Sequence, residues 1–188
     1  DGMATVWASS QGQFMVRNYS ATVCGMDISK VRVLPAEIGG GFGGKTTVYL
    51  EPVAIILSKK SGKPVKIVMN REDVFRATGP TSGGHAHAKI GAKKDGTITA
   101  WEAKAYLAVG AYASYAPVPG GLRGVLEMGG PYRVENVKLT VIQTYANLVP
   151  CGFARAPGMP QGLWAGESHM DACARAIGMD PYDFRIKN

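Results

Sequence analysis

The segment GHAHAKIGAKKDGTITAWEAKAYLAVGAY, residues 84–112, distinguishes between two fold classes. Apolar and polar residues alternate along both of its halves, and the KKDG between them is a turn sequence. The segment therefore predicts two long strands joined as an antiparallel hairpin. The chain before it has the alternating strand and helix pattern that would suit a doubly wound fold. A long hairpin does not continue that pattern, so the sequence predicts an α+β domain instead.

The elements around the hairpin follow from periodicity and capping residues. Before the hairpin we expect strands at 4–10, 30–38 and 65–70, and helices at 13–26 and 51–64. Gly25 and Gly62 end the two helices. After the hairpin we expect a strand at 134–147 and a helix at 160–178. A final helix begins with Asp180 as its N-cap and Pro181 at the first helical position.

Composition limits the class of protein. The chain of 188 residues is long enough for one domain or two small ones, and no segment is apolar enough to span a membrane. The three cysteines lack a C-x-x-C pair, which favours a reducing, cytoplasmic compartment over a disulfide scaffold. The formal charge is +7, but the lysines and arginines form no continuous run. We expect solvated basic faces, with docking of an acidic partner or anionic substrate as the alternative, and no nucleic-acid or membrane partner.

A second informative segment is IGGGFGGKT, residues 38–46, which holds five glycines, one Phe and one Lys within seven positions. It fits three interpretations. The string from Gly39 to Thr46 matches the G-x-x-x-x-G-K-[ST] phosphate loop, and its first six residues match the G-x-G-x-x-G dinucleotide fingerprint. The third interpretation is a loop whose backbone amides contact an anionic ligand directly, because glycine allows positive φ and close approach.

Both nucleotide interpretations meet obstacles. A phosphate loop should lead directly into a helix, and Pro52 would then interrupt that helix. No Asp directly follows an apolar strand to help hold magnesium. A dinucleotide site needs a strand that continues into the glycines, but Pro35 interrupts it. Arg71 lies where the ribose-binding acid should be, so only a 2′-phosphate version would remain. Nucleotide binding through Gly39 to Thr46 stays as the alternative hypothesis.

The third interpretation is supported by a resemblance along nearly the whole chain. The motifs are, in order, GGGFGGK, SGKPVKIVMNRED, GPYRVENV and ARAPGMPQG. They resemble the molybdenum-binding subunits of the xanthine dehydrogenase/aldehyde oxidase family. That family consists of molybdenum hydroxylases, which insert a water-derived oxygen into an aldehyde or aromatic heterocycle and pass electrons through iron–sulfur clusters to flavin. The resemblance implies mixed and antiparallel sheets with packed helices, and it makes residues 1–188 the first half of the molybdopterin-binding region.

The resemblance also implies roles for individual residues. Gln11 matches the glutamine that hydrogen-bonds an oxo or hydroxo ligand of molybdenum. Phe42 and Gly43 match the pair at the metal, and Gly40 and Gly41 belong to the same loop, against the dithiolene and the pterin. None of these residues is expected to ligate the metal directly. A loop rich in amides suits a ligand with a phosphate and soft sulfurs.

Arg155 matches the family's arginine beside the pterin and the metal. The positions that would contact substrate depart from the purine oxidases. Thr46 replaces a glutamate, Pro157 replaces an aromatic residue, and the second substrate arginine falls near Ala113. Xanthine is therefore not the expected substrate. Ala156 follows the arginine, where carbon monoxide dehydrogenases have a cysteine, and Cys151 lies too early in the chain to replace it.

The family's general-base glutamate lies in a G-V-G-E motif far toward the C-terminus, outside this chain. Glu167 follows a glycine but is expected to be structural. We therefore expect an excised fragment that is inactive alone. The resemblance implies a molybdenum–molybdopterin cofactor, with the cytosine dinucleotide as one of its forms. It also implies a small-molecule substrate, and iron–sulfur clusters and FAD on partner subunits or domains.

The three histidines are a further candidate site. His85 and His87 would share one face of a strand, and His169 lies on a predicted helix. Three histidines can bind a metal, but only the H-x-H pair has supporting spacing. We therefore expect surface positions.

Overall fold

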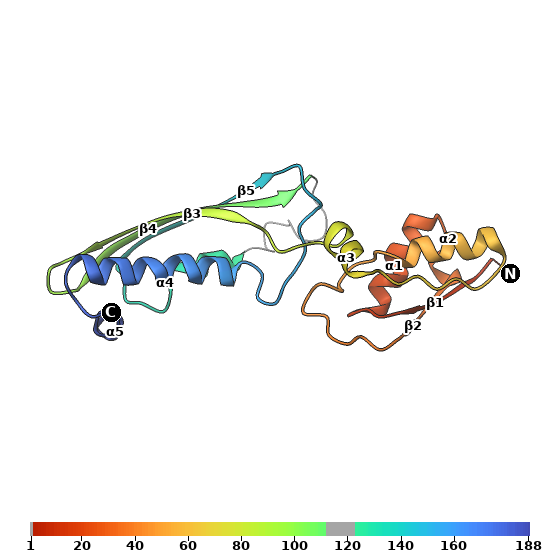
Figure 1. Cartoon of the computed structure of the whole chain (residues 1–188), viewed down its shortest axis with the longest axis horizontal. Coiled ribbons are helices and arrows are strands. Elements are labelled where there is room, and N and C mark those ends of the chain that lie inside the picture. Colours follow the sequence, from red (N-terminus) through yellow and green to blue (C-terminus); the bar gives the residue numbers. More distant parts are fainter. Residues whose placement is uncertain (1, 112–122) are drawn as a thin grey trace. The chain divides into compact units, whose positions relative to one another are not determined.

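The computed structural model describes residues 2–111 and 123–188 (Figure 1). The chain forms two compact units. The first comprises Asp1–Pro80 and Gly152–Arg155, and the second comprises Thr81–Cys151 and Ala156–Asn188. No helix in these described ranges is long and apolar enough to cross a membrane.

The first unit is built around a strand–helix–strand motif. Its elements are β1 (Ala4–Ala8), α1 (Gln13–Cys24), the 3₁₀ helix η1 (Ile28–Lys30), β2 (Val31–Pro35), α2 (Glu51–Ser61) and α3 (Arg71–Ala77). β1 pairs with β2 in parallel, from Ala4 opposite Val31 to Ala8 opposite Pro35. A small core joins β1, α1 and α2 through Val6, Ala8, Val16 and Ile55.

The predicted helix ends of this unit are confirmed. Gly25 and Gly62 both adopt the left-handed conformation, with φ of 61° and 65°, and their amides donate to carbonyls of the preceding turn. Helix α3 was not predicted. Asn70 is its N-cap and accepts from the Asp73 amide, while the Asp73 carboxylate accepts from the Asn70 amide. This capping box was visible in the sequence as N-x-x-D.

The predicted strand at 65–70 is wrong. Exposure alternates residue by residue there, as the sequence pattern suggested, but no strand is formed. Alternation reports which side chains face the core, whereas a strand also needs a hydrogen-bonding partner. Among the described residues, no other strand pairs with this segment.

The second unit is a curved three-stranded sheet with α4 along one face (Figure 1). Its elements are β3 (Gly84–Ala92), β4 (Ile98–Gly110), η2 (Arg123–Gly129), β5 (Asn136–Tyr145), α4 (Met159–Ala176) and α5 (Pro181–Lys187). The strand order is β3-β4-β5. β3 and β4 form the predicted antiparallel hairpin, and β5 pairs with β4 in parallel. The sheet is therefore mixed, and the predicted α+β class is confirmed.

One face of β4 supplies most of the core of this unit. Trp101, Ala103, Ala105 and Leu107 are buried there, against residues of η2, α4 and α5. Close packing of α4 on η2 depends on two glycines. A Cβ at Gly162 or Gly166 would lie 2.6 Å or 2.2 Å from a carbonyl oxygen of η2, so only glycine fits.

Candidate functional site

The glycine loop of the first unit has an unusual backbone. Gly39, Gly40 and Gly43 have φ of 63°, 108° and 89°, and Phe42 has φ of 49°. A bulky residue in the left-handed region is strained, and such residues concentrate at functional sites. The Phe42 side chain is also 68% exposed, so burial in a core does not explain its presence.

Gln11, between β1 and α1, anchors this loop. Its side-chain Oε1 accepts hydrogen bonds from the Gly43 amide at 2.9 Å and the Lys45 amide at 3.1 Å. The backbone amide of Gln11 donates to the Lys45 carbonyl at 2.9 Å. Two N–H donors require an acceptor, which fixes the carboxamide orientation by chemistry. The Nε2 group has no protein acceptor among the described residues, so it is left as a donor.

Two loop glycines are required by close contacts. A Cβ on Gly41 would lie 2.4 Å from Gln11 Cδ, and a Cβ on Gly43 would lie 2.9 Å from Phe153 Cβ. The segment that contains Phe153 belongs to the first unit and is tied to it by a bond from the Gly152 amide to the Pro80 carbonyl, 2.8 Å long. The loop is thus packed between Gln11 and the residues before Arg155.

The upstream amides of the loop remain available. The amides of residues 39–42 donate to no acceptor in the part of the chain that the structure describes. Consecutive amides with positive φ at several residues form a concave group of donors that suits anionic atoms. Arg155 is exposed, and it forms no ion pair or hydrogen bond with any described residue.

Lys45 is used by the protein itself. Its ammonium donates to the Ile38 carbonyl and, at 3.2 Å, to the Ser9 hydroxyl. The next helix begins only at Glu51. A phosphate loop needs its lysine free for phosphate and a helix directly after it, and neither condition is met. Thr46 likewise donates its hydroxyl to the Gly43 carbonyl at 2.7 Å.

The remaining predicted positions belong to the second unit or fall outside the described residues. Pro157 and Ala156 belong to the second unit, and Ala156 is exposed with φ of 56°. Ala113 lies outside the described residues. Cys151 is buried, and its thiol donates to the Ala108 carbonyl at 3.3 Å, so it is not an exposed nucleophile.

The histidines do not form a three-histidine site. No cluster of three or more potential metal ligands occurs within 2–111 and 123–188. His85 and His87 form a pair on β3, with 3.0 Å between their Nε2 atoms. His169 lies on α4, where burial lowers its pKa.

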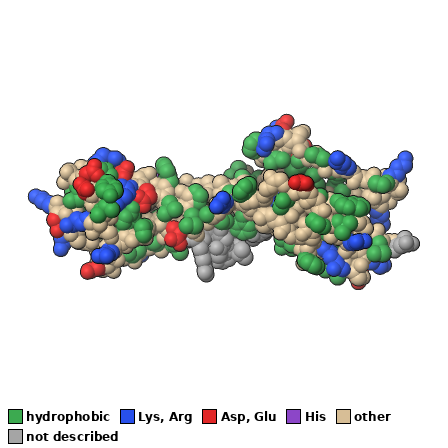
Figure 2. Space-filling model, turned by 90° about the horizontal axis from the view of Figure 1, so that it is seen from below, with side chains coloured by type: hydrophobic (Ala, Val, Ile, Leu, Met, Phe, Trp, Pro, Cys, Tyr) green, Lys and Arg blue, Asp and Glu red, His purple; other side chains and the backbone are tan. Residues whose placement is uncertain are grey.

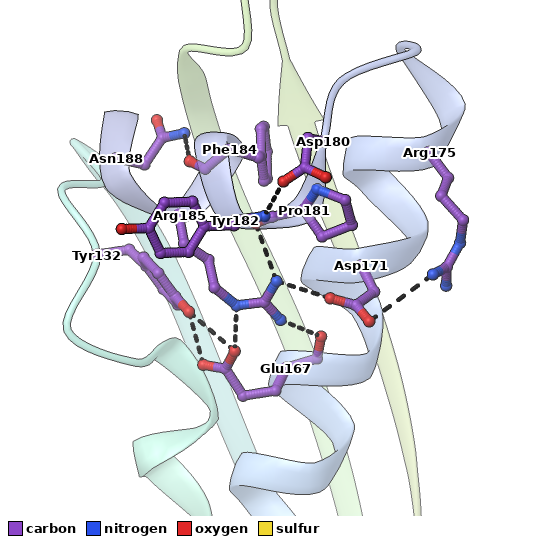
Figure 3. Close-up of polar contacts among 10 residues, drawn as sticks. All are labelled: Tyr132, Glu167, Asp171, Arg175, Asp180, Pro181, Tyr182, Phe184, Arg185 and Asn188. Atoms are coloured by element: carbon purple, nitrogen blue, oxygen red, sulfur yellow. Dashed lines mark hydrogen bonds and ion pairs between the residues drawn. The ribbon is translucent and has the colours of Figure 1, made fainter.

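A polar network in the second unit was missed by sequence reasoning (Figure 3). Glu167, in the middle of α4, accepts from the Tyr132 hydroxyl at 2.7 Å and from Arg185 Nε at 2.8 Å. Arg185 also pairs with Asp171 at 2.7 Å. The network links α5 and the segment after η2 to α4. Glu167 therefore has the structural role that was expected.

The network shifts two pKa values. Burial, followed by the hydrogen bond and charge of Glu167, raises the pKa of Tyr132 to about 12. Burial favours a lower pKa for Arg185, but its hydrogen bonds to Glu167 and Asp171 outweigh that effect and raise it. Both shifts favour the protonation states that the network needs.

The surface charge shows no single basic patch on the face drawn in Figure 2. Lysine and arginine side chains lie scattered among apolar and acidic ones. The lysines at the end of α2, for example, follow the apolar residues Val53 and Ile56, which are both exposed.

Comparison with known proteins gives a consistent result. The family model described as molybdopterin cofactor-binding domain matches residues 1–188. The chain is 37% identical over 188 residues to the nicotinate dehydrogenase large molybdopterin subunit of Eubacterium barkeri, covering all of this chain and 44% of that protein. It is 33% identical over 193 residues to the xanthine dehydrogenase molybdenum-binding subunit of Escherichia coli, covering all of this chain and 25% of that protein.

A solved structure is also similar to this chain over its whole length. The aldehyde oxidoreductase from Desulfovibrio gigas, activated with sodium dithionite and sodium sulfide, aligns over 100% of this chain and 21% of its own. The TM-score is 0.84 and the sequence identity is 28%. The chain thus spans less than half the length of each of these three proteins.

Proposed function

Because the chain belongs to the molybdopterin cofactor-binding domain family, we propose that it is part of a molybdenum hydroxylase that oxidises an aldehyde or an aromatic heterocycle with water-derived oxygen. The relatives named above are a nicotinate dehydrogenase, a xanthine dehydrogenase and an aldehyde oxidoreductase. These names include both substrate classes. In this proposal residues 1–188 form the first half of the cofactor-binding region, and the glycine loop, Gln11 and Arg155 hold the cofactor.

The Gln11–loop contact is the observation that supports this proposal most. With its Oε1 held by the Gly43 and Lys45 amides, Gln11 can present only its Nε2 donor to a ligand. A fixed donor costs little reorganisation when it binds an acceptor on the cofactor. The two amides also hold the loop in shape.

The loop chemistry fits an anionic, sulfur-rich cofactor. The backbone amides of Gly40 and Gly41 donate to no described residue. A Cβ at Gly41 or Gly43 would collide with protein atoms. A guanidinium at Arg155 suits a phosphate or another anionic group of a pterin cofactor. Phe42 adds an exposed aromatic face that can exclude water beside the bound group.

In this proposal the residues of this chain bind and orient the cofactor. When bound, the cofactor supplies the two-electron redox chemistry and oxygen transfer. Gln11 and the loop amides donate hydrogen bonds to it, and Arg155 neutralises charge. No residue of this chain is assigned as the general base, which is expected in the part of the protein outside it. Iron–sulfur clusters and FAD on partner subunits or domains would accept the electrons, and the cytosine dinucleotide is one form that the pterin would take.

The nucleotide alternative is less well supported. The Lys45 ammonium and the Lys45 amide are both bonded to protein acceptors, and no helix follows the loop directly. Nucleotide binding would have to break these contacts first. Tight ATP binding that is lost in Lys45→Ala would revive it.

The test uses the full-length protein from a host that makes the molybdenum cofactor. Metal analysis and the fluorescence of released, oxidised pterin should show molybdenum and pterin together. Gly43→Val should lose both, because valine is strained at φ of 89° and would collide with Phe153. Gly83→Ala is the matched control, since a Cβ there meets nothing within 4 Å. Wild-type protein without molybdenum would overturn the proposal.

A further inference from the structure

The outer face of the β3–β4–β5 sheet has an exposed pair of histidines. His85 and His87 are two residues apart on β3, so both side chains project from the same face. Their cross-strand neighbours on β4 are Tyr106 and Lys104. Trp101 and the other core residues of β4 occupy the opposite face, and both imidazoles are therefore accessible from solvent.

The two rings are arranged as a chelate would require. The Nε2 atoms are 3.0 Å apart, the ring centroids are 4.5 Å apart and the ring planes are 81° from each other. A metal ion about 2.1 Å from each nitrogen would subtend an angle of about 90°, and the ring centroids would then be about 4.6 Å apart. Nitrogens that met head-on at the same separation would place the centroids more than about 5 Å apart.

From this geometry we propose that His85 and His87 form an exposed two-histidine site for a divalent transition-metal ion with tetragonal coordination. An angle of about 90° matches square-planar or octahedral geometry, which is typical of Cu(II) and Ni(II). A tetrahedral Zn(II) site would need the nitrogens about 3.4 Å apart. Cu(II) should bind most tightly, as the affinity order of divalent metals indicates, with water completing the coordination.

Neighbouring charges affect the metal affinity of this site. Lys104 is opposite His87, and its ammonium lies 5.0 Å from the centre of the Tyr106 ring. The next cross-strand pair on this face is Lys89 and Glu102, and Glu102 also pairs with Lys138 on β5 at 3.7 Å. The ammonium of Lys104 repels a bound cation, so it weakens the site.

The site is independent of the proposed molybdenum chemistry, because it lies in the second unit and uses none of the loop residues.

The test titrates Cu(II) or Ni(II) alone into the full-length protein by calorimetry, with electron paramagnetic resonance of the bound Cu(II). His85→Gln and His87→Gln should each weaken Cu(II) binding at least tenfold and reduce the nitrogen hyperfine coupling from that of two imidazoles to that of one. His169→Gln is the matched control and should change neither. Lys104→Gln should tighten binding severalfold. Wild-type affinity in both single variants, or Zn(II) binding more tightly than Cu(II), would overturn the proposal.

Discussion

Gly41→Ala isolates the contact between the glycine loop and Gln11. The φ of Gly41 is not in the left-handed region, so alanine causes no backbone strain there. Its Cβ would instead lie 2.4 Å from Gln11 Cδ and 2.5 Å from Gln11 Oε1. Gln11 must move away, and the hydrogen bonds from the Gly43 and Lys45 amides to its Oε1 are lost.

The expected cost follows from the bonds that are lost. Each neutral hydrogen bond contributes about 0.5–1.5 kcal/mol, so the closed loop should lose about 1–3 kcal/mol. At about 1.4 kcal/mol per factor of ten, amide exchange of the loop should become roughly 5 to 150 times faster. The backbone bond from Gln11 to Lys45 does not depend on the side chain and should persist.

The assay is hydrogen–deuterium exchange by mass spectrometry on cofactor-free full-length protein, followed over the peptide that contains Gly43 and Lys45. Gln11→Ala should accelerate exchange by a similar factor, because the same two amides lose the same acceptor. In the Gln11→Ala background, Gly41→Ala should have almost no further effect, since nothing remains for its Cβ to displace. Equal effects of Gly41→Ala in both backgrounds would refute the reasoning.

Three further predictions concern the second unit. Asn188→Ala should speed exchange of the Ile98 amide, because it removes that amide's acceptor and two donated bonds, at a cost of about 1.5–4.5 kcal/mol. Glu167→Gln should lower the pKa of Tyr132 from about 12, while burial keeps it above 10.0, as followed by the absorbance of tyrosinate. Folding favours the neutral Tyr132 phenol, so its stabilisation is complete below pH 10 and is lost as the pH rises toward about 12. Tyr132→Phe should remove that alkaline loss in denaturation experiments.

The exchange and titration predictions each have a control in the same unit. Asn136→Ala removes a single side-chain bond to Thr99, so it should affect exchange less than Asn188→Ala does. Lys138→Gln breaks only an exposed ion pair and should leave the tyrosine titration unchanged. An unchanged titration in Glu167→Gln would show that the carboxylate does not interact with the phenol.

Local signals predicted most of the fold. The KKDG turn forms as expected, with Gly96 at φ of 88° and bonds that join Lys93 to Thr97 and Gly96. The final helix begins at its predicted cap, where Asp180 accepts from two amides. These features depend on neighbouring residues, so a single sequence contains the information.

Contacts between distant residues could not be predicted in the same way. Gln11 bonds to amides 32 and 34 residues away, and no local pattern specifies which oxygen it uses. The Tyr132–Glu167 bond spans 35 residues. The sequence resemblance selected Gln11 as important, but only the folded loop indicates that its Oε1 is occupied and its Nε2 is the remaining donor.

The same glycine–lysine string can serve two kinds of ligand because its function depends on which donors the protein itself uses. In a phosphate loop, the lysine and the amides at the helix start must stay free for the ligand. Here the Lys45 amide is hydrogen-bonded to Gln11, and its ammonium is hydrogen-bonded to Ser9 and Ile38. The downstream end of the string therefore holds the loop in place through contacts within the protein. Within residues 2–111 and 123–188, no acceptor is found for the amides of residues 39–42 or for the Nε2 of Gln11. A ligand that needs amide donors beside an exposed aromatic ring fits this end of the loop better than a triphosphate does.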